Sequence, residues 1–421
     1  MLDSAAPATE TRDSPGCPYA GTFPFAGSSH LGPDPRYAQL RAEAPVARVR
    51  TAGGVDGWLV SSYAAVRAAL ADPRLSRAAT CVPGAPRIGG SMTTTPEMII
   101  SMDGTEHARL RKLVAGGFTM RRMADLRGRV VEVVDELLDD MAATGSPADL
   151  VQALCLPMPL TVIGEMLGVP RADLQTFEKY ARAFATVDDR AGGEESMAGL
   201  AKLNEYIVGL VADKRAEPGD DMLSALITAR DDDDRLSEQE LVTFGFTLIG
   251  AGFDTTANQL ANSVLALLGA FPEQYRWLAA DPTRIPVAVE ELLRRVNLFS
   301  TDTTGFHRIA TEDLEIAGTP IAAGEVVILA LASANRDDAV FADADELDLA
   351  RATNPHLSFG HGVHYCLGKH LGRIEMQVAL DALVRRFPDL RLAVAEHELD
   401  WHHGEINHTL TALPVAWGPA R

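Results

Sequence analysis

The amino-acid sequence predicts a mostly α-helical fold with a minor β region. Over residues 121–143 and 148–167, apolar side chains recur every three or four positions with charged residues between them, which is the pattern of helices that bury one face. Residues 237–272 continue the helical pattern in the middle of the chain. Over residues 46–63, by contrast, β-branched and aromatic residues alternate around a Gly-Gly pair, which predicts a small hairpin.

The composition is that of ordinary globular material. Hydrophobic residues make up 47% and charged residues 23% of the 421 positions, a length that suits either two or three domains or one large enzyme domain. The longest apolar runs, such as residues 326–332, are short enough to be buried strands and too short to span a membrane. Residues 1–29 combine small residues, prolines and acidic residues without a basic segment followed by an apolar core, so a flexible tail is expected there.

Cysteine usage and charge limit the expected partners. The four cysteines, Cys17, Cys81, Cys155 and Cys366, are widely separated and form no CxxC pair, so neither a disulfide framework nor a zinc site is expected. This usage favours a reducing cytoplasm. The formal net charge of −20 at pH 7 argues against nucleic acid or an anionic membrane surface as the main partner.

The expected long helix has an unusual centre. Ser237 and Glu240 form a capping-box pattern at its start, and helical spacing continues to Pro272, a length of roughly 50 Å at about 1.5 Å per residue. Near its middle the sequence reads Gly250-Ala251-Gly252-Phe253-Asp254-Thr255-Thr256. Glycine costs about 1 kcal/mol relative to alanine inside a helix, so the small residues indicate either a tight helix crossing or a surface for a flat cofactor. The acid and alcohols that follow favour the cofactor, because a threonine hydroxyl that bonds a backbone carbonyl can open the helix locally.

A glycine-rich loop leads into another expected helix near the C-terminus. It reads Phe359-Gly360-His361-Gly362-Val363-His364-Tyr365-Cys366-Leu367-Gly368. The three glycines Gly360, Gly362 and Gly368 would permit backbone conformations closed to other residues and let N–H groups approach the sulfur, while the following helix would place its positive end beside the anion. A thiolate held in this way can be the axial ligand of haem iron, with Phe359 shielding it from water. The alternative is an ordinary buried cysteine.

Two weaker patterns place charged residues on one helical face. Glu291 and Arg294 lie three positions apart, and His107 and Arg111 lie four apart. By spacing alone, the first pair would be a surface ion pair of about 0.3–0.5 kcal/mol. The second would be a solvated basic face.

The motifs, in their order along residues 35–417, resemble those of the cytochrome P450 family. The resemblance implies a single haem domain over residues 30–421, with haem between the long helix and the cysteine loop. It implies that Cys366 ligates the iron and that Asp254 and Thr255 act in oxygen activation and proton delivery. Other implied roles are propionate contacts by His107, Arg111, Arg308 and His364, a haem lining of Phe359, Gly360, Gly368, Ala251 and Gly252, and a buried ion-pair group of Glu291, Arg294 and Arg351.

The same resemblance implies a monooxygenase. A substrate RH, O₂, two electrons and two protons would give ROH and water, with haem b (iron protoporphyrin IX) as the cofactor. No flavin or nicotinamide fingerprint appears in the sequence, so electrons are expected from NAD(P)H through a ferredoxin or flavodoxin and its reductase. Arg109, Lys112, Lys369 and Arg373 flank the motifs around the expected thiolate and could attract an acidic donor protein. A cytoplasmic monomer is expected.

The substrate pocket is expected over the haem. By resemblance it draws on residues 78–100 and on Thr247, Gly250, Ala251, Thr303, Thr304, Ile406 and Asn407. Asn407 and the threonines offer hydrogen bonds, which favours a large, oxygenated or peptidic molecule such as a secondary metabolite. Two alternatives remain. One is a haem-thiolate enzyme that uses peroxide or rearranges its substrate, where the Asp254-Thr255 pair would be unusual; the other is a non-catalytic docking module, where an intact Cys366 would be unusual.

Overall fold

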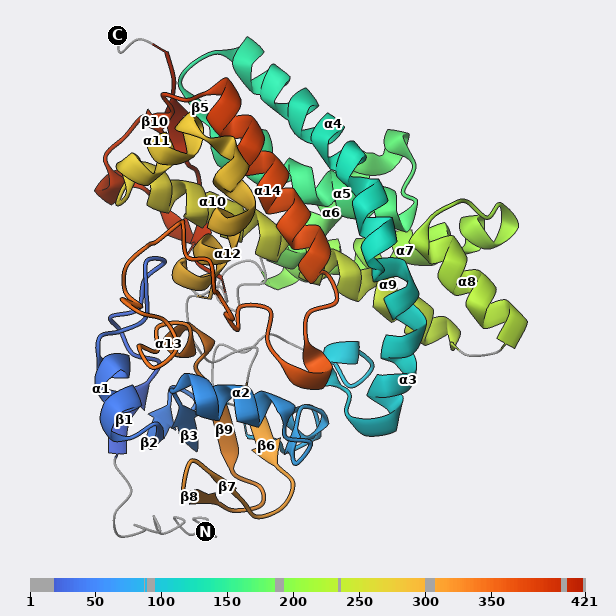
Figure 1. Ribbon diagram of the computed structural model, residues 1–421. Helices are drawn as coiled ribbons and strands as arrows, with labels where there is room; N and C mark the ends of the chain where they lie inside the picture. The colour runs from blue at the N-terminus through green and yellow to red at the C-terminus, as the bar shows by residue number, and fades with distance from the viewer. Residues whose placement is uncertain are drawn as a thin grey trace, which may run out of the picture.

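The protein is a helical assembly with a smaller β region at one end (Figure 1). The computed structural model describes residues 19–86, 88, 95–185, 193–233, 236–299, 307–402 and 407–418. The predicted fold class, mostly α with a minor β region, is therefore confirmed. Within the described ranges, no helix combines the length and the apolar character needed to cross a membrane.

A six-stranded mixed sheet forms the main β region. Its strands, in spatial order, are β1 (Tyr19–Phe23), β2 (Val46–Thr51), β3 (Asp56–Val60), β9 (Val326–Leu329), β6 (Arg308–Ala310) and β4 (Leu75–Ser76). The predicted hairpin is present, because β2 and β3 pair antiparallel from Val46 opposite Val60 to Arg50 opposite Asp56. All four residues of β9 are buried, as expected of a short apolar strand in a sheet interior.

The sheet also takes in part of the segment expected to be a tail. Strand β1 pairs in parallel with β2, with Phe23 opposite Thr51. The side chains of Phe23 and Phe25 are buried and pack edge to face, with ring centroids 5.5 Å apart. Residues 19–25 thus belong to the β region, because burying two phenylalanine side chains gives more free energy than burying a polar segment would.

Three smaller sheets lie elsewhere in the described part of the chain. They pair β10 (Arg391–Leu392) with β13 (Pro414–Ala416) and β5 (Ala148–Asp149), β11 (Trp401–His402) with β12 (Thr409–Leu410), and β7 (Leu314–Ile316) with β8 (Thr319–Ile321). The first of these sheets corrects the prediction of one helix over residues 148–167. Residues 148–149 form a strand, 151–155 a turn of π-helix, and only Pro157–Leu167 (α5) an α-helix. The Asp149 carboxylate accepts hydrogen bonds from the N–H groups of Val151 and Leu413, at 3.0 and 2.9 Å, so tertiary pairing outweighs the helical periodicity.

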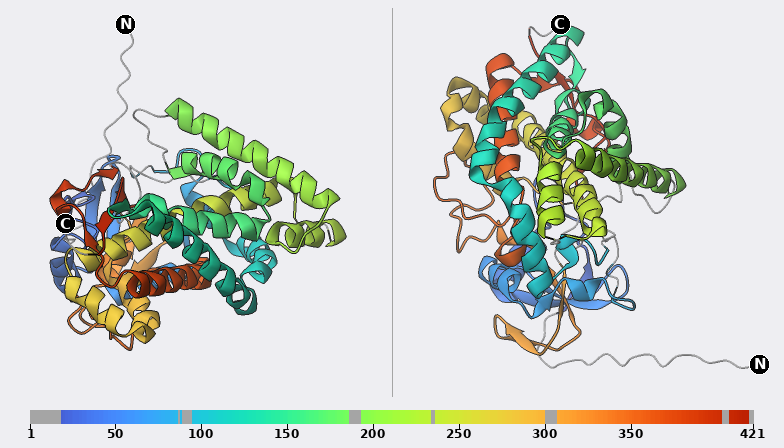
Figure 2. Two further views of the ribbon diagram at one scale, coloured as in Figure 1. Left: turned by 90° about the horizontal axis from the view of Figure 1, so that it is seen from above. Right: turned by 90° about the vertical axis from the view of Figure 1, so that its right-hand side faces the viewer.

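The remaining helices are α1 (Arg36–Glu43), α2 (Tyr63–Ala71), α3 (Gly104–Ala115), α4 (Met120–Thr144), α6 (Leu174–Ala185), α7 (Gly193–Ala216), α8 (Met222–Asp233), α11 (Pro272–Ala280), α12 (Ile285–Arg295), α13 (Leu331–Ala334) and α14 (Lys369–Arg386). Most of them surround one large hydrophobic core, whereas α1, α2 and α13 pack in two smaller clusters at the six-stranded sheet. The predicted helix over residues 121–143 is α4, which packs alongside α14 (Figure 2). Helices α7 and α8 lie at the edge away from the six-stranded sheet (Figures 1 and 2).

Two collinear helices cross the middle of the molecule in place of the single long helix that was expected. They are α9 (Glu238–Gly252) and α10 (Asp254–Leu268), separated at Phe253. The capping box is present: the Glu240 N–H donates to Ser237 Oγ over 3.1 Å, and the Ser237 N–H donates to the Glu240 carboxylate over 2.7 Å. Helix α10 ends at Leu268, before Pro272.

Candidate active site

The break between α9 and α10 is held by two threonine hydroxyls. Thr255 Oγ1 donates to the carbonyl of Ala251 over 2.8 Å, and Thr256 Oγ1 donates to the carbonyl of Gly252 over 3.2 Å. Side-chain donors thus satisfy two carbonyls where the helix opens, as the sequence predicts. Ala251 is exposed, although Gly250 before it and Phe253 after it are buried. The helix therefore presents an open flank at Ala251.

The glycine next to this flank serves helix packing. A Cβ atom added to Gly252 would lie 3.2 Å from Ile163 Cδ1 on α5. This contact is tighter than ordinary van der Waals contact, so Gly252 allows α9 and α5 to approach closely. The two interpretations of the small residues thus apply to neighbouring positions: Gly252 lies at a helix crossing, and Ala251 faces open space.

Amide side chains contact both oxygens of the Asp254 carboxylate. Asn258 Nδ2, one turn further along α10, donates to Oδ1 over 3.0 Å. Asn407 Nδ2, from the segment before β12, donates to Oδ2 over 2.6 Å. The family resemblance implies that Asn407 lines the substrate pocket, and no local pattern in the sequence indicates its contact with Asp254.

The cysteine loop is closed by its own backbone. The Cys366 N–H donates to the Phe359 carbonyl over 2.9 Å. Gly360 and Gly362 have φ of +74° and +72°, the left-handed region that favours glycine. Gly368 differs from the expectation, since its φ of −78° is open to any residue; its contribution is its N–H, which bonds the Cys366 sulfur.

Opposing effects act on the Cys366 thiol. Burial raises its pKa, while the Gly368 N–H and the charges of Lys369, Arg111 and Arg373 act in the opposite direction. A metal cation at the sulfur would overcome the effect of burial, because a coordinated thiol is deprotonated. Among the described residues, no group of three or more His, Cys, Asp or Glu side chains could hold a metal ion, so a single thiolate is the protein ligand that this loop offers.

The four expected propionate contacts lie close to this loop. His107 and His364 have ring centroids 4.3 Å apart. Arg111 donates to the carbonyl of Tyr365, the residue before the cysteine. Burial, then the neighbouring His364 and Arg111, lowers the pKa of His107 to about 4. Burial, and then the charge of Arg77, lowers the pKa of Arg308 to about 9.

The structure adds Arg77 and Asp103 to this cluster. Arg77 is 1% exposed, and its guanidinium donates to the carbonyls of Ile100 and His307 at 3.2 and 3.1 Å. Asp103 accepts hydrogen bonds from Ser76 and from the N–H groups of Arg77 and Ala78. Neither residue belongs to a periodic pattern, so no local signal in the sequence points to them.

The cluster fits the propionates of haem. Arg77 and Arg308 are buried cations. The charge of Asp103 acts to raise the pKa of both guanidiniums, against the effect of burial. Within the described ranges, His364 Nε2 is buried without a hydrogen-bond partner, and the Asp103 carboxylate oxygen is 3.6 Å away. Two buried guanidiniums and an unsatisfied imidazole nitrogen call for an additional anion, and haem brings two carboxylates.

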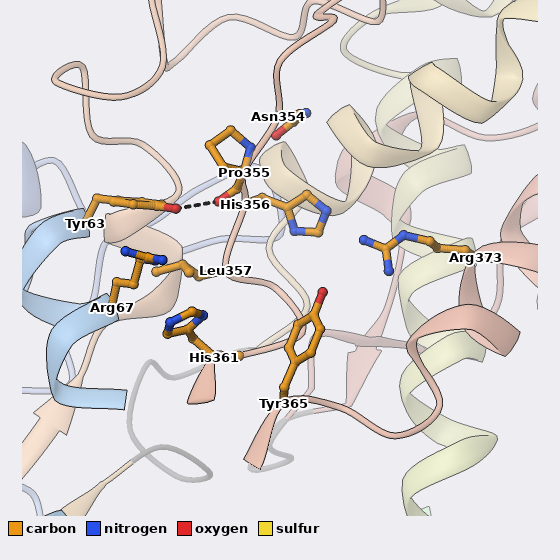
Figure 3. A pocket seen from close by; sticks show the side chains of 10 residues that line it. Tyr63, Arg67, Asn354, Pro355, His356, Leu357, His361, Tyr365 and Arg373 are labelled. Carbon is orange, nitrogen blue, oxygen red and sulfur yellow. Dashed lines mark hydrogen bonds between the residues drawn. The ribbon is translucent and has the colours of Figure 1, made fainter. Parts of the chain in front are cut away.

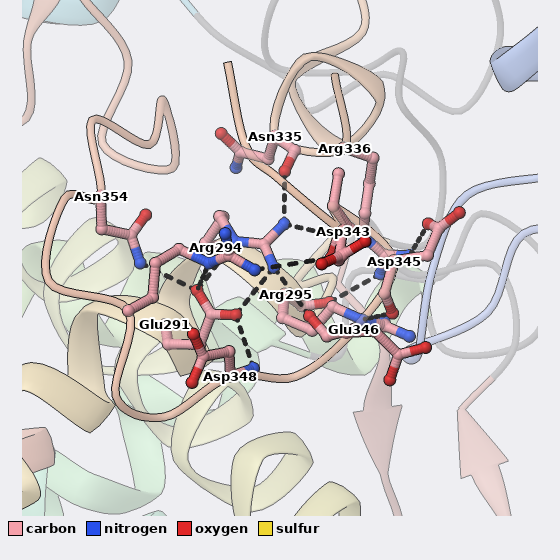
Figure 4. Close-up of polar contacts among 12 residues, drawn as sticks. Glu291, Arg294, Arg295, Asn335, Arg336, Asp343, Asp345, Glu346, Asp348 and Asn354 are labelled. Carbon is pink, nitrogen blue, oxygen red and sulfur yellow. Dashed lines mark hydrogen bonds and ion pairs between the residues drawn. The ribbon is translucent and has the colours of Figure 1, made fainter. Parts of the chain in front are cut away.

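A buried ion-pair network centres on Glu291 and Arg294 of α12 (Figure 4). Glu291 and Arg294 on α12 form a two-pronged pair with both N–O distances at 2.8 Å and with fully buried side chains. Arg351 Nε lies 3.1 Å from the same carboxylate. The Glu291 carboxylate also accepts from the Asp348 N–H and from Asn354 Nδ2, so it takes five hydrogen bonds. The structure thus brings Glu291, Arg294 and Arg351 together.

The remaining expected pocket residues are only partly described. Thr247 is half-buried, and its hydroxyl donates to the Thr243 carbonyl over 2.7 Å, so it can only accept a bond from a substrate. Gly250 is buried. Thr303, Thr304 and Ile406 lie outside the described residues, as do parts of residues 78–100.

The expected basic patch is partly neutralised. Arg109 pairs with Glu106 at 3.0 Å and with Glu240, and Arg373 makes a two-pronged pair with Glu290 at 2.7 and 2.8 Å. The Lys369 ammonium lies over the Tyr365 ring, 4.6 Å from its centroid. Lys112 is exposed. Two of the four cations are therefore already bound by acids of this chain.

A mostly helical fold with one cysteine loop, a locally opened central helix and a buried cationic cluster is typical of haem-binding oxygenases with a thiolate ligand. The family model for cytochrome P450 matches residues 285–395. Nocardicin C N-oxygenase of Nocardia uniformis is 47% identical over 94% of this chain and 98% of the relative. The cytochrome P450 monooxygenase PikC of Streptomyces venezuelae is 42% identical over 92% of each chain.

The solved structures that this protein resembles belong to the same family. The LnmA cytochrome P450 hydroxylase of the leinamycin pathway of Streptomyces atroolivaceus has a TM-score of 0.87 and 44% identity, over 94% of this chain and all of that one. The mixed-function P450 MycG has a TM-score of 0.87 and 42% identity, over 94% and 99%. The chain therefore belongs to the cytochrome P450 family. It is a monooxygenase that uses haem and O₂, takes a small-molecule substrate and receives electrons from redox partner proteins.

Proposed function

We propose that the enzyme inserts one oxygen atom into a large, oxygenated or peptidic secondary metabolite. Relatives named nocardicin C N-oxygenase and mycinamicin IV hydroxylase/epoxidase support this, at 47% and 43% identity. The hydrogen-bonding side chains of Thr247 and Asn407 also support a polar substrate. When bound, haem supplies the chemistry that reduces O₂ and oxidises the substrate.

In this proposal the Cys366 loop and the residues around it bind the haem. Cys366 would hold the iron, the Gly368 N–H would stabilise the sulfur, and His107, Arg111, Arg308 and His364 would bind the propionates. Phe359, Gly360, Ala251 and Gly252 would flank the ring, and the Glu291, Arg294 and Arg351 group would brace the side of the loop. The observation that supports this most directly is the thiol with a donated N–H and three nearby cations.

Asp254 and Thr255 would deliver protons. The Thr255 hydroxyl gives its hydrogen to the Ala251 carbonyl, so its lone pairs can accept a proton donor or an ordered water. The Asp254 carboxyl, one residue away, would take a proton from water and pass it to the open flank of the helix. Oxygen reduction consumes two protons, so their supply controls how reducing equivalents are divided between product and peroxide.

A ferredoxin or flavodoxin, with a reductase that oxidises NAD(P)H, would supply the electrons to a monomeric enzyme in the cytoplasm. A cavity of about 420 Å³ lies on the surface beside the cysteine loop, and Tyr63, Arg67, His356, His361, Tyr365 and Arg373 line part of it (Figure 3). Arg67 on α2 is exposed. This cavity offers the Arg67 cation and the Tyr365 hydroxyl, so we assign it as the place where an acidic side chain of the donor protein docks.

The absorption difference spectrum of the reduced protein with carbon monoxide tests the assignment of Cys366. Wild type and a Cys81→Ala control are expected to give the strongly red-shifted Soret band of a thiolate-ligated haem. Cys366→His is expected to lose that band. A neutral-ligand band in wild type, or a red-shifted band in Cys366→His, would refute the assignment.

Spectral titration with nocardicin C and mycinamicin IV tests the substrate class. A shift of the Soret band on addition of either compound, saturating at micromolar concentration, is expected if the pocket suits large polar metabolites. Saturable binding of small apolar terpenes alone would place the enzyme in a different substrate class.

A further inference from the structure

Asn407 links Asp254 to a segment far away in the sequence. Its Nδ2 donates to Asp254 Oδ2 over 2.6 Å, across 153 positions of the chain. Asn258 holds the other carboxylate oxygen from within α10. A carboxylate that accepts two amide hydrogens is fixed in orientation, and both hydrogen bonds favour its ionised form.

The segment that carries Asn407 is itself anchored on two sides. The backbone of Asn407 forms a β-bridge with Phe299, and the N–H of the next residue, His408, donates to the Leu298 carbonyl over 2.7 Å. On the other side, Asn262 Nδ2 on α10 donates to the His408 carbonyl over 2.8 Å. Asn407 therefore approaches Asp254 from a support attached to the same helix, and its amide can hold a fixed position.

The other end of the Asn407 amide is unsatisfied. Asn407 is 6% exposed, and its Oδ1 is buried without a hydrogen-bond partner among the residues that the structure describes. Buried polar atoms of this kind usually meet water or a ligand, because leaving them unpaired costs free energy. Asn407 directly follows Ile406, an expected substrate-pocket residue. The oxygen thus lacks a hydrogen-bond donor next to the expected substrate pocket.

We infer that Asn407 is a positioning residue for proton delivery: its amide N–H holds the Asp254 carboxylate, and its Oδ1 accepts a hydrogen bond from a donor in the pocket. The donor is an ordered water in the substrate-free enzyme and a hydroxyl or N–H group of the substrate when one is bound. A donor on Oδ1 polarises the amide and strengthens its bond to Asp254. This inference rests on the proposed role of Asp254 and adds a reason for a polar substrate.

Infrared titration of the substrate-free holoenzyme tests the contact without turnover. The protonated carboxyl band of Asp254 is identified by its loss in Asp254→Asn. In Asn407→Leu the pKa of this carboxyl is expected to rise by roughly one unit, because one donor to the ionised form is gone. Asn297→Leu is the matched control: this amide is equally buried, but it donates to the Ser29 carbonyl. An unchanged Asp254 pKa in Asn407→Leu would refute the inference.

A carboxylate in place of the amide gives a second, pH-dependent test. In Asn407→Asp, two carboxyl groups would face each other, so one pKa of the pair is raised. Below that pKa the pair shares a proton and Asp254 stays in place; above it both groups are ionised and repel. His408, the nearest described imidazole on this segment, has its pKa lowered to about 4 by burial, so it stays neutral over the range tested.

The readout is the division of electrons between hydrogen peroxide and water, the two products of O₂ reduction when no substrate is added, between pH 6 and 8.5, with a [2Fe–2S] ferredoxin and its reductase as donor. Asn407→Asp is expected to match wild type at the acidic end and to lose several-fold more electrons as peroxide at the alkaline end. Asn407→Leu is expected to show the loss at every pH, and Asn407→Ser replaces it if the leucine variant does not fold. A flat profile in Asn407→Asp would contradict the inference.

The two measurements separate this inference from the proposed function. If Asp254→Asn leaves the peroxide fraction unchanged, the role of Asp254 in proton delivery is wrong, whatever Asn407 does. If Asp254→Asn changes the fraction and Asn407→Leu changes neither the carboxyl pKa nor the fraction, only the role of Asn407 is wrong. In crystals of the substrate-free holoenzyme, a water within hydrogen-bond distance of Asn407 Oδ1 is expected, and an empty site there would remove the second half of the inference.

Discussion

Two adjacent threonines, Thr255 and Thr256, have different surroundings on one stretch of helix. Each hydroxyl bonds the carbonyl four residues earlier. Thr255 bonds the carbonyl of the exposed Ala251, whereas Thr256 also contacts the carboxyl of Glu375 on α14. Because the helix opens at this point, one threonine borders the expected reaction space and the other borders the protein interior.

Thr255→Ala is expected to retain haem and substrate binding but to lower product formed per NAD(P)H about tenfold, with peroxide making up the difference. The hydroxyl that accepts a hydrogen bond from the proton donor is gone, while the fold is retained. Thr144→Ala is the control, since its hydroxyl makes the same bond to a carbonyl four residues earlier on α4 and it lies outside the expected site. Equal coupling in wild type and Thr255→Ala would mean that the substrate itself brings the protons.

Glu375 is a fully buried acid. Burial raises its pKa to about 8, against a small opposite effect of the bond to Thr256. It is therefore protonated in the folded enzyme at neutral pH, whereas in the unfolded chain it ionises above its usual pKa of 4.5. Between these two values the folded state binds one proton more than the unfolded state.

The free energy of unfolding should consequently fall as pH rises from 5 to 8, by about 1 kcal/mol per pH unit from this group. Glu375→Gln keeps the shape of the protonated acid and removes this slope. The difference between wild type and variant in urea unfolding at several pH values measures it. Other titrating groups cancel in the difference, and the exposed Asp381→Asn serves as a control that should leave the slope intact.

Two glycines of the cysteine loop, Gly360 and Gly362, meet different structural demands. A Cβ atom on Gly362 would lie 2.7 Å from the Leu70 carbonyl oxygen, whereas one on Gly360 would have the His364 carbonyl at 3.9 Å as its nearest contact. Both glycines have positive φ. Gly362 thus meets two demands, conformation and close approach to α2, and Gly360 meets only the first.

Gly360→Ala is expected to cost about 1–2 kcal/mol of stability from the left-handed conformation alone. Gly362→Ala is expected to cost more, because the α2 backbone must also move, and to lower the haem content of the purified protein. Thermal unfolding and haem per folded protein measure the two effects. Equal losses in both variants would show that the contact with α2 relaxes freely.

Glu291 on α12 is the centre of the other element. Its fully buried carboxylate takes hydrogen bonds from Arg294, Arg351, Asn354 and the Asp348 N–H. Removing one partner of such a network leaves uncompensated buried charge. The spacing of three residues alone would have indicated a weak surface pair. Burial, and not spacing, determines how much this pair contributes to stability.

Glu291→Ala is therefore expected to cost about 3–5 kcal/mol. The exposed helical pair of Arg385 and Asp381 provides the comparison, since Asp381→Ala should cost only about 0.3–0.5 kcal/mol. Denaturant unfolding of the holoenzyme compares the two. A cost below 1 kcal/mol for Glu291→Ala would mean that water replaces the carboxylate.

At the scale of the whole molecule, charge determines how an acidic enzyme can receive an acidic partner. The chain carries a formal net charge of −20, yet Lys112 and Arg67 are exposed on the elements beside the cysteine loop. Arg109 and Arg373 already pair with acids of this chain. The local patch that can act on a partner is thus smaller than the sequence suggested.

Reversal of Lys112 and Arg67 to glutamate is expected to slow reduction by a ferredoxin several-fold at low salt, with the difference shrinking as ionic strength rises. Arg171→Glu, on an exposed residue remote in sequence from this face, is the control. Stopped-flow reduction rates at 20 and 300 mM salt measure the effect. An equal effect of the control reversal would mean that total charge, and not this face, controls the rate.

The sequence predicts the molecule unevenly, for physical reasons. Glu240 and Ser237 lie three positions apart and meet locally, so the cap is predictable. The pairing of β5 with β13 joins residues far apart, and it overrides a helical pattern over residues 148–155. Contacts such as Asn407 with Asp254, or Arg77 with His307, depend on tertiary placement that no local spacing encodes.

Residues 335–361 contain no helix or strand, although they run from α13 to the cysteine loop. Backbone carbonyls of Asn335, Ala344 and Glu346 in this segment are held by the Arg294 guanidinium. A protease needs an extended, detachable stretch of chain, so this segment should be protected in the native enzyme. Once Arg294 or Glu291 is lost, it should become the first site of cleavage, releasing the cysteine loop on a C-terminal fragment.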